Sequence, residues 1–276
     1  MSHRGNDPWL DLATAVSNGS IPGMEILRER GRDVRIARVT GPEGRSVIVK
    51  CWCRTGLRGA LRRLSGSNVA WREYVALRRL HAAGIPCPPP LAYRRLDLSN
   101  ACHTEALVSG DLGICRDSTE WYKRILQDDP PAARAFERHL VEATATMVKC
   151  GLIDTDHRLP NFVIPPDGIP VRLDFELCIP TRFPMFQPAR LGRMIGVLLG
   201  SYHFAVQPDI ARSTAFARQL LARIPLAAAA KRHTLLTVEE MLDRQQREAG
   251  IESAFEAWKE ALARAPGTRI MQEGDD

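Results

Sequence analysis

The stretch Ile153–Glu176, IDTDHRLPNFVIPPDGIPVRLDFE, decides the fold that we expect for this chain of 276 residues. It holds Asp156, then Asn161 five residues later, and then a second aspartate, Asp174, which Phe175 follows. Between the asparagine and the second aspartate, two short apolar runs flank the turn-forming letters PPDG, which predicts a β-hairpin. Such a hairpin would bring Asn161 and Asp174 to one end.

The order D-x-x-x-x-N followed by D-F is that of protein-kinase-like phosphotransferases. Phosphoryl transfer requires a protein to position an attacking hydroxyl and to hold metal ions against the phosphate charge. We therefore expect Asp156 to orient the substrate hydroxyl, and Asn161 and Asp174 to supply oxygen ligands to Mg²⁺. Each residue alone has an ordinary structural explanation, because Asp and Asn are frequent in turns and helix caps.

A lysine and a glutamate upstream complete the pattern. Residues 34–39 and 46–52 are predicted to pair as strands, and Lys50 lies near the end of the second in the context V-I-V-K. This is close to the V-A-I-K of kinases, whose lysine contacts the nucleotide phosphates. Residues 69–80 have helical periodicity, and Glu73 within them is expected to pair with Lys50. A surface lysine and a solvated glutamate are the structural alternatives.

The rest of the chain is predicted to build two lobes around these residues. We expect an N-terminal arm at 1–23, a nucleotide-binding lobe at 24–108 and a catalytic lobe at 109–276. In the first lobe, a small antiparallel sheet and one main helix are expected, and backbone groups of Glu105 and Leu107 are predicted to meet an adenine edge. The second lobe is predicted to be mainly helical, which makes the fold class α+β. Its helices are expected near 131–150, 190–204, 209–223, 237–248 (with a Thr237…Glu240 capping box) and 251–265.

Composition excludes several classes of protein. The chain is 45% hydrophobic and 25% charged, as ordinary globular proteins are, and no apolar run approaches the roughly 18 residues that span a bilayer. Its seven cysteines lack the spacing of a disulfide framework, and its first residues lack the apolar core of a signal peptide, which together predict a cytoplasmic location. The net charge of +6 suits an anionic partner, but without basic runs that alternate with aromatics we expect no nucleic acid.

With Lys50, Glu73, Asp156, Asn161 and Asp174 in this order, the chain resembles the protein-kinase-like superfamily. The stretches SVIVK at 46–50, REYVALRRL at 72–80 and AGIPCP at 83–88 resemble the lipopolysaccharide core kinases of the Kdo/WaaP type. The resemblance covers residues 24–180 and implies a two-lobed protein-kinase-like fold that uses ATP and Mg²⁺. It also implies phosphoryl transfer to a hydroxyl of a lipopolysaccharide inner-core sugar, Kdo or heptose.

Kinases of that type act on the cytoplasmic side of the inner membrane. The resemblance therefore implies an anionic, lipid-linked sugar as acceptor and a peripheral contact with the inner membrane. Residues 54–64 form a basic stretch with leucines spaced for one helical face, which suits an anionic substrate or an acidic membrane surface. A solvated helix face is the alternative for this stretch.

The sequence departs from the kinase pattern in three places. Asp154-Thr155 stand where kinases have His-Arg, Glu176 replaces the glycine after D-F, and GPEG at 41–44 differs from a glycine-rich loop. An acidic residue at Glu176 favours a small-molecule or sugar kinase over a regulated protein kinase. Two alternatives stay open: a kinase of a small soluble acceptor such as an aminoglycoside or amino alcohol, and a non-catalytic pseudokinase that scaffolds a partner.

Overall fold

The computed structural model describes residues 7–30, 33–53, 68–97, 99, 101–224, 226–249, 256, 259 and 260. Its contacts divide the chain into two compact units. The first unit comprises residues 1–113 and 174–176, and the second comprises residues 114–173 and 177–276. The division thus falls after residue 113, whereas we expected it after residue 108. The D-F-E residues at 174–176 also join the first unit, whereas we expected them in the catalytic lobe.

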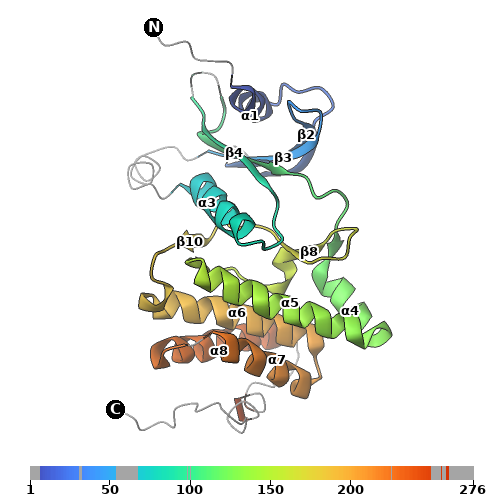
Figure 1. Cartoon of the computed structure of the whole chain (residues 1–276), viewed down its shortest axis with the longest axis vertical. Helices are drawn as coiled ribbons and strands as arrows, with labels where there is room; N and C mark the ends of the chain where they lie inside the picture. The colour runs from blue at the N-terminus through green and yellow to red at the C-terminus, as the bar shows by residue number, and fades with distance from the viewer. Residues whose placement is uncertain are drawn as a thin grey trace. The chain divides into compact units, whose positions relative to one another are not determined.

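The first unit is built on a five-stranded antiparallel sheet with the strand order β1-β2-β3-β5-β4 (Figure 1). The predicted hairpin is confirmed as β2 and β3. Strand β1 escaped prediction because all of its residues are exposed, so it has no apolar alternation to detect. The strands are β1 Glu25–Arg30, β2 Val34–Thr40, β3 Ser46–Trp52, β4 Pro90–Arg95 and β5 Glu105–Gly110.

One helix covers each face of this sheet, α1 (Pro8–Asn18) and α3 (Val69–Ala82), as Figure 1 shows. Successive side chains of a strand point to opposite faces. In β3, Val47, Val49 and Cys51 therefore belong to the apolar cluster that includes residues of α1. Lys50 points to the other face, where it meets α3.

The N-terminal arm expected at 1–23 is not a separate segment, because α1 is part of the first unit. Ala13 and Val16 of this helix are fully buried in the apolar cluster of the sheet. The carboxylate of Asp7 caps the helix by accepting bonds from two main-chain N–H groups of its first turn. It also forms a 2.6 Å ion pair with Arg94 of β4, which fastens the start of the helix to the sheet.

The second unit is mainly helical, as the sequence predicted. Helix α6 packs closely against α8 along Gly192, Gly196 and Gly200. A Cβ at Gly196 would lie 2.6 Å from the Cβ of Thr237, so only glycine permits this approach. The helices are α4 Ser118–Asp128, α5 Pro130–Lys149, α6 Pro188–Val206, α7 Ile210–Arg223 and α8 Ala228–Ala249.

Short strands and 3₁₀ turns carry the stretch that opens the sequence analysis. The predicted hairpin is confirmed, since β8 pairs with β9 through Phe162 with Arg172 and Val163 with Val171. Strand β6 extends this sheet on the other side of β8, and β7 pairs with β10. The elements are β6 Arg116–Asp117, β7 Leu152–Asp154, η1 Leu159–Asn161, β8 Phe162–Ile164, β9 Val171–Arg172, β10 Cys178–Pro180 and η2 Pro184–Phe186.

The start at residue 237 that we predicted for the helix 237–248 was wrong. Helix α8 begins at Ala228, and Thr237 lies inside it, where its hydroxyl donates a 2.8 Å hydrogen bond to the carbonyl of His233. A threonine that bonds back in this way sits within a helix and caps nothing. Most of the helix expected at 251–265 and all of the basic stretch at 54–64 lie outside the described residues. No helix in the described ranges is both long and apolar enough to cross a membrane.

Candidate active site

Lys50 and Glu73 form an ion pair inside the first unit, as predicted. The Nζ of Lys50 lies 2.7 Å from Oε1 of Glu73, and their side chains are 16% and 3% exposed. Burial alone would lower the pKa of Lys50, but attraction to Glu73, and then to Asp174, outweighs it and leaves the pKa raised. The ammonium therefore keeps its positive charge at neutral pH, as a phosphate contact requires.

Asp174 also belongs to the first unit, and it has an unusual backbone. Its φ of 57° lies in the left-handed region, and within the described ranges it is the one non-glycine residue with a positive φ. Its Oδ1 atom is buried and has no hydrogen-bond partner among the described residues, and the same holds for Oε2 of Glu73. Strained backbone and unsatisfied oxygens gather at functional sites, so these carboxylates fit a hard cation.

Glu176, the residue that replaces the kinase glycine, ties the D-F-E residues to the rest of the first unit. Its Oε1 accepts a 3.2 Å hydrogen bond from the indole Nε1 of Trp52 in β3. Its main-chain carbonyl accepts a 3.1 Å bond from Arg72 of α3. Phe175, between the two acidic residues, is fully buried. Glu176 thus has a positioning contact that a glycine could not make.

The second unit brings Asp156 and Asn161 together, as their expected roles require. The Nδ2 amide of Asn161 donates to Oδ2 of Asp156 at 2.9 Å and to its main-chain carbonyl at 2.7 Å. Because the amide nitrogen is used in this way, the side-chain oxygen Oδ1 of Asn161 is the atom suited to a metal. The Nε of Arg158 lies 3.2 Å from Oδ1 of Asp156, and the Asp156 side chain is 32% exposed. A cation thus stands beside the predicted catalytic carboxylate.

Asp154, where kinases have histidine, forms a buried ion pair with Arg172 of β9. The two groups lie 2.6 Å apart, and their side chains are 0% and 1% exposed. The other carboxylate oxygen of Asp154 accepts a 3.0 Å bond from the main-chain N–H of Asp156. The departure at position 154 therefore comes with its own partner, which supports the loop by a different pair of residues.

Arg172 contacts the loop at further points and is the main site residue that the sequence analysis missed. It donates to the main-chain carbonyls of Asp156 and Asn161, each at 3.2 Å, and its Nε lies 3.4 Å from Nδ1 of His157. One rigid guanidinium thus joins both ends of the segment between the predicted catalytic and metal residues. The available signal was an arginine in the apolar strand VRLDF, where a buried charge needs a partner.

His157 extends the same network toward α5. Its Nε2 lies 2.9 Å from Oγ1 of Thr144, whose hydroxyl donates to the carbonyl of Leu140. Burial, and next the positive charge of Arg172, hold the pKa of His157 well below its ordinary 6.5. The ring is therefore neutral, and it accepts from Arg172 at Nδ1 and donates to Thr144 at Nε2.

The backbone positions predicted to meet adenine lie deeper in the sheet than expected. Glu105 and Leu107 are inside β5, and each has a ladder partner in β3 and another in β4. Their main-chain groups therefore bond to neighbouring strands, and the pairing does not support a contact with a nucleobase.

The GPEG turn at 41–44 is not the counterpart of a glycine-rich loop. It joins β2 to β3 at the end of the sheet where Thr40 pairs with Ser46. Lys50 lies toward the opposite end, where Val34 pairs with Trp52 and where β1 turns into β2. The connection nearest the lysine is thus the one from Arg30 to Val34, of which residues 31 and 32 lie outside the described ranges.

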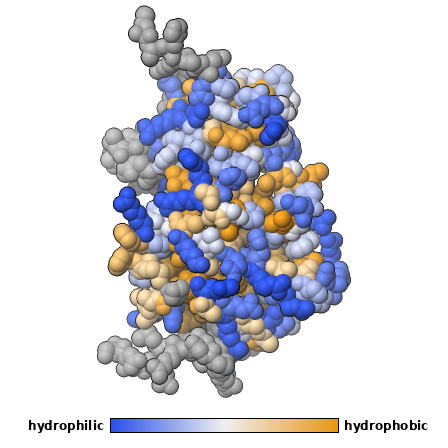
Figure 2. Space-filling model, in the orientation of Figure 1, coloured by the Kyte–Doolittle hydropathy of each residue, from blue (hydrophilic) through white to orange (hydrophobic). Residues whose placement is uncertain are grey.

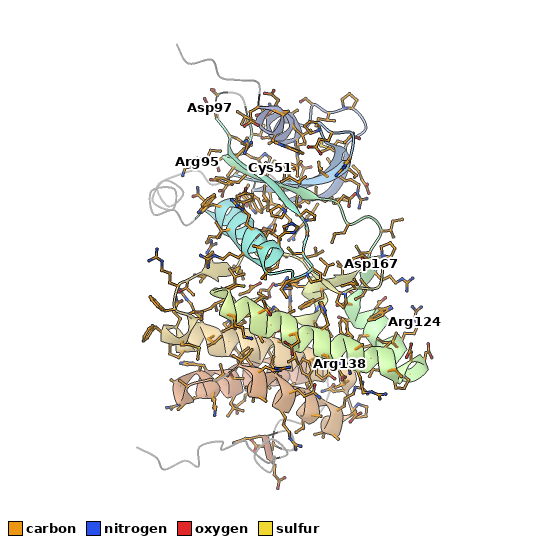
Figure 3. All side chains as sticks on the ribbon, viewed as in Figure 1. Cys51, Arg95, Asp97, Arg124, Arg138 and Asp167 are labelled. Carbon is orange, nitrogen blue, oxygen red and sulfur yellow. The ribbon has the colours of Figure 1, made fainter. Side chains whose placement is uncertain are left out.

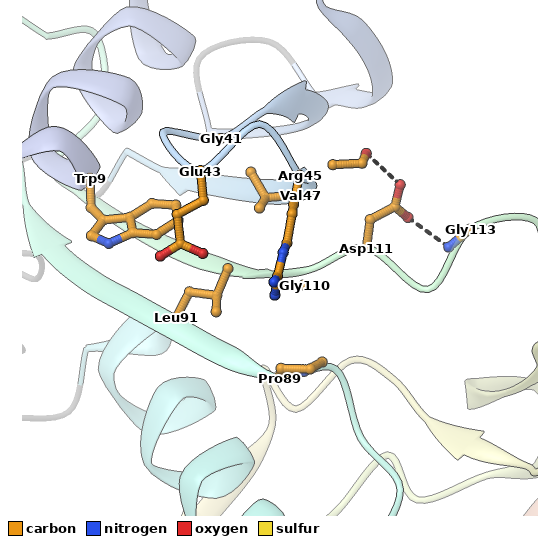
Figure 4. A pocket seen from close by; sticks show the side chains of 11 residues that line it. Trp9, Gly41, Glu43, Arg45, Val47, Pro89, Leu91, Gly110, Asp111 and Gly113 are labelled. Carbon is orange, nitrogen blue, oxygen red and sulfur yellow. Dashed lines mark hydrogen bonds between the residues drawn. The ribbon is translucent and has the colours of Figure 1, made fainter.

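A pocket of about 450 Å³ opens in the first unit beside the GPEG turn (Figure 4). Trp9, Leu91 and Pro89 supply its apolar wall, and Glu43 supplies a carboxylate. Its lining does not include the lysine, glutamate or aspartate of the first unit that we assign to the candidate site. We therefore do not assign the nucleotide to this pocket.

Comparison with known proteins identifies the fold. No family model matches the chain, and no curated protein matches it. Among solved structures, WaaP in complex with acyl carrier protein is similar, with 20% sequence identity and a TM-score of 0.58. The likeness covers 90% of this chain and 93% of that chain, so it reaches well beyond residues 24–180. The predicted α+β, two-lobed kinase-like fold is therefore confirmed, and the resemblance to kinases of the Kdo/WaaP type holds at the level of the fold.

Proposed function

We propose that the protein is an ATP- and Mg²⁺-dependent kinase that phosphorylates a hydroxyl of a lipopolysaccharide inner-core sugar, Kdo or heptose. The observation that carries the proposal is the bonding of the Asn161 amide to Asp156, in a chain whose Lys50 is paired with Glu73. The fold shared with WaaP and the resemblance in sequence support the acceptor class.

The residues present fit a nucleotide and its metal. Asp174 has a buried carboxylate oxygen that accepts no hydrogen bond from a described residue, and Asn161 has a side-chain oxygen beside its bonded amide nitrogen. These hard oxygen donors suit Mg²⁺, which when bound neutralises the charge on the transferring phosphoryl group. Lys50 would contact the α- and β-phosphates, and Glu73 would hold its ammonium in place.

The chain's own residues then divide the work. Asp156 accepts the proton of the acceptor hydroxyl or orients it, with its carboxylate fixed by Asn161. Arg158, beside that carboxylate, offers a positive charge to the transferred phosphoryl oxygens. Arg172 holds the loop in a fixed shape from below the surface and touches no substrate.

The adenine edge is expected at the main chain that follows β5. The ladders of β5 end where the N–H of Gly110 bonds to Pro89 and the N–H of Asp111 bonds to Ser46. Residues 111–113 follow immediately, where the N–H of Gly113 bonds to the Asp111 carboxylate, so we move the expected contact from Glu105 and Leu107 to the carbonyl groups of this segment.

The proposal is tested with purified protein, ATP, Mg²⁺ and core oligosaccharide that lacks phosphate. Asp156→Ala should reduce turnover by about 10²- to 10⁴-fold, the usual contribution of general acid–base catalysis. Asp167→Ala, at an exposed aspartate of the β8–β9 turn (Figure 3), is the matched control and should leave turnover unchanged. Equal turnover in both variants would exclude the role of Asp156.

Further arms of the assay separate the alternatives. Transfer to an aminoglycoside or amino alcohol, and not to the core sugars, would replace the acceptor class. Calorimetry that finds no Mg²⁺-dependent nucleotide binding to the wild-type protein would favour a pseudokinase. WaaP was solved in complex with acyl carrier protein, so each reaction is run with and without that protein.

A further inference from the structure

A short loop of the second unit exposes large apolar side chains that no part of the candidate site uses. Between β10 and α6, Phe186 is 82% exposed, Phe183 is 62% exposed and Met185 is 42% exposed. Figure 2 shows light-orange surface at this edge of the molecule, beside the start of α6 in Figure 1. Large apolar side chains that cluster on a surface mark an interaction site more often than single ones do.

The loop is an ordered structure that holds these rings outward. The side-chain oxygen of Thr181 accepts from the main-chain N–H of Phe183 and from the amide of Gln187, both at 3.2 Å. The N–H of Thr181 donates a 2.7 Å bond to the carbonyl of Gly151, which anchors the loop to the unit. The two phenylalanine rings contact edge to face, with centroids 5.8 Å apart. Their exposure is therefore fixed by the loop's own bonds.

Basic side chains surround the loop. Arg182 lies within it and Arg190 follows it in sequence, both are exposed, and Arg193 follows one turn further along α6. Residues 177–238 contain eight Arg or Lys and one Asp, Asp209, which lies beyond the far end of α6. Three of these basic residues belong to α7, where Arg212 pairs with Glu137 and Arg223 with Glu142. The charge near the loop therefore comes from Arg182, Arg190, Arg193, Lys231 and Arg232.

The first turns of α8 supply part of this charge. Gly192 of α6 contacts Ala230 and His233, so exposed Arg232 of α8 lies at the α6 end nearest the loop. Among the residues that the structure describes, Glu240 is the acidic partner of these cations, 3.9 Å from Arg193 and further along α8. An anion that approaches the rings therefore meets mainly guanidinium groups.

We propose that residues 181–187, with Arg182 and Arg190, form a docking loop for an anionic lipid bilayer. The rings of Phe183 and Phe186 enter the interface, where aromatic side chains are favoured, and the arginines contact acidic headgroups. Binding to the bilayer does not depend on the kinase activity. The role that we give to this binding, which is to bring the kinase to a lipid-linked acceptor, rests on the proposed function.

The shape of the loop favours a bilayer over a protein partner. A stable protein interface needs about 800 Å² on each side and a complementary surface for its anchors. Here the apolar side chains stand on a protruding turn of a few residues, and the surrounding surface is charged. A tip of this kind gains from insertion into a fluid interface, where no matching pocket is required.

The test measures binding to vesicles, without nucleotide or acceptor, so that its outcome is independent of catalysis. The full-length protein should sediment with phosphatidylglycerol-containing vesicles, bind pure phosphatidylcholine weakly, and dissociate as salt is raised. The double variant Phe183→Ser/Phe186→Ser should reduce the partition coefficient by about tenfold or more. Ile169→Ser is the control, because Ile169 is 47% exposed but stands beside Asp167 in another turn.

A second pair of variants tests the charges. Arg182→Glu/Arg190→Glu should abolish the preference for anionic vesicles. Arg124→Glu/Arg138→Glu changes the net charge equally on α4 and α5, away from the start of α6 (Figure 3), and should retain most binding. The proposal is overturned if the wild type does not bind, if both charge variants lose binding equally, or if the Phe variant binds normally. It is also overturned if gel filtration shows a dimer that the Phe variant dissociates, since a second copy would then cover the loop.

Discussion

The carboxylates of the two units differ in how completely they are bonded. In the second unit, one oxygen of Asp154 accepts from Arg172 and the other from the N–H of Asp156. In the first unit, Glu73 and Asp174 each keep one buried oxygen without a hydrogen-bond partner among the described residues. The difference separates a group that fixes the shape of a loop from groups that remain available to a cation.

The energetics of these two arrangements are opposite. A buried acceptor without a partner costs about 1–3 kcal/mol, so the open carboxylates reduce the stability of the first unit until a ligand arrives. The closed pair stabilises a single loop conformation, but only while both partners are present. The first arrangement suits binding and the second suits positioning, and each can be disrupted separately.

Breaking the closed pair should have the largest effect on stability. Asp154→Leu or Arg172→Met alone leaves one buried charge without its partner, and should lower the free energy of unfolding by about 3–5 kcal/mol. The double variant Asp154→Leu/Arg172→Met removes both charges and should recover most of that loss. Urea unfolding of the four proteins measures the coupling between the two residues.

The double variant also separates stability from positioning. It keeps the fold but lacks the bonds from Arg172 to the carbonyls of Asp156 and Asn161, so turnover should stay well below wild type. Arg172→Lys keeps the charge without the fork of donors, and should lower kcat more than it changes KM. Single variants as stable as wild type would contradict the role of a buried pair.

Neutralising an open carboxylate should change stability less and ligand binding more. Asp174→Asn removes a repulsion with Glu73 but also an attraction to Lys50, so the stability of the free protein should change little. The apparent dissociation constant for Mg²⁺-ATP should rise by about 10- to 100-fold, the range for disturbed metal sites. Thermal shift titrations measure both quantities in one experiment.

An exposed carboxylate outside the site serves as the comparison for that variant. Asp167→Asn, in the β8–β9 turn, should change neither the stability nor the metal-dependent shift. If Asp174→Asn responds to Mg²⁺-ATP as the wild type does, Asp174 is not a metal ligand.

The fold could be predicted where single residues carry a local signal. The alternation of apolar and polar residues predicted the hairpin of β2 and β3, and helical periodicity followed by a glycine predicted α5. The pairing of Lys50 with Glu73 followed because V-I-V-K in a predicted strand and a glutamate in the next helix match the kinase pattern. Local patterns were sufficient at these positions.

Prediction failed where a partner distant in sequence decides the structure. Thr237 and Glu240 match the capping-box pattern, but the residues before Thr237 also favour a helix, so α8 continues through this position. From the sequence, Asp154 could be described only as a replacement of the kinase histidine. Its partner Arg172 is in another strand, and only the fold brings the two together. Helix α1 looked like an arm because its apolar residues need the sheet to bury them.

Removing the titration of His157 should have the smallest effect on the free energy of unfolding, and it tests whether the ring beside Arg172 is neutral. Its pKa in the folded protein lies well below 6.5, whereas the unfolded chain binds a proton near that value. Below pH 6.5 the unfolded state therefore binds a proton that the folded state does not bind. The free energy of unfolding then falls as pH decreases, by at most about 1.4 kcal/mol per pH unit. His157→Asn keeps an amide for Thr144 and Arg172 but cannot titrate, so its stability should fall less steeply. The buried His103 and His203 and the half-buried His139 also have lowered pKa values, but they are present in both proteins and cancel in the difference. Urea unfolding of both proteins between neutral pH and mildly acid pH measures this difference, and parallel curves would show that His157 is already protonated in the fold.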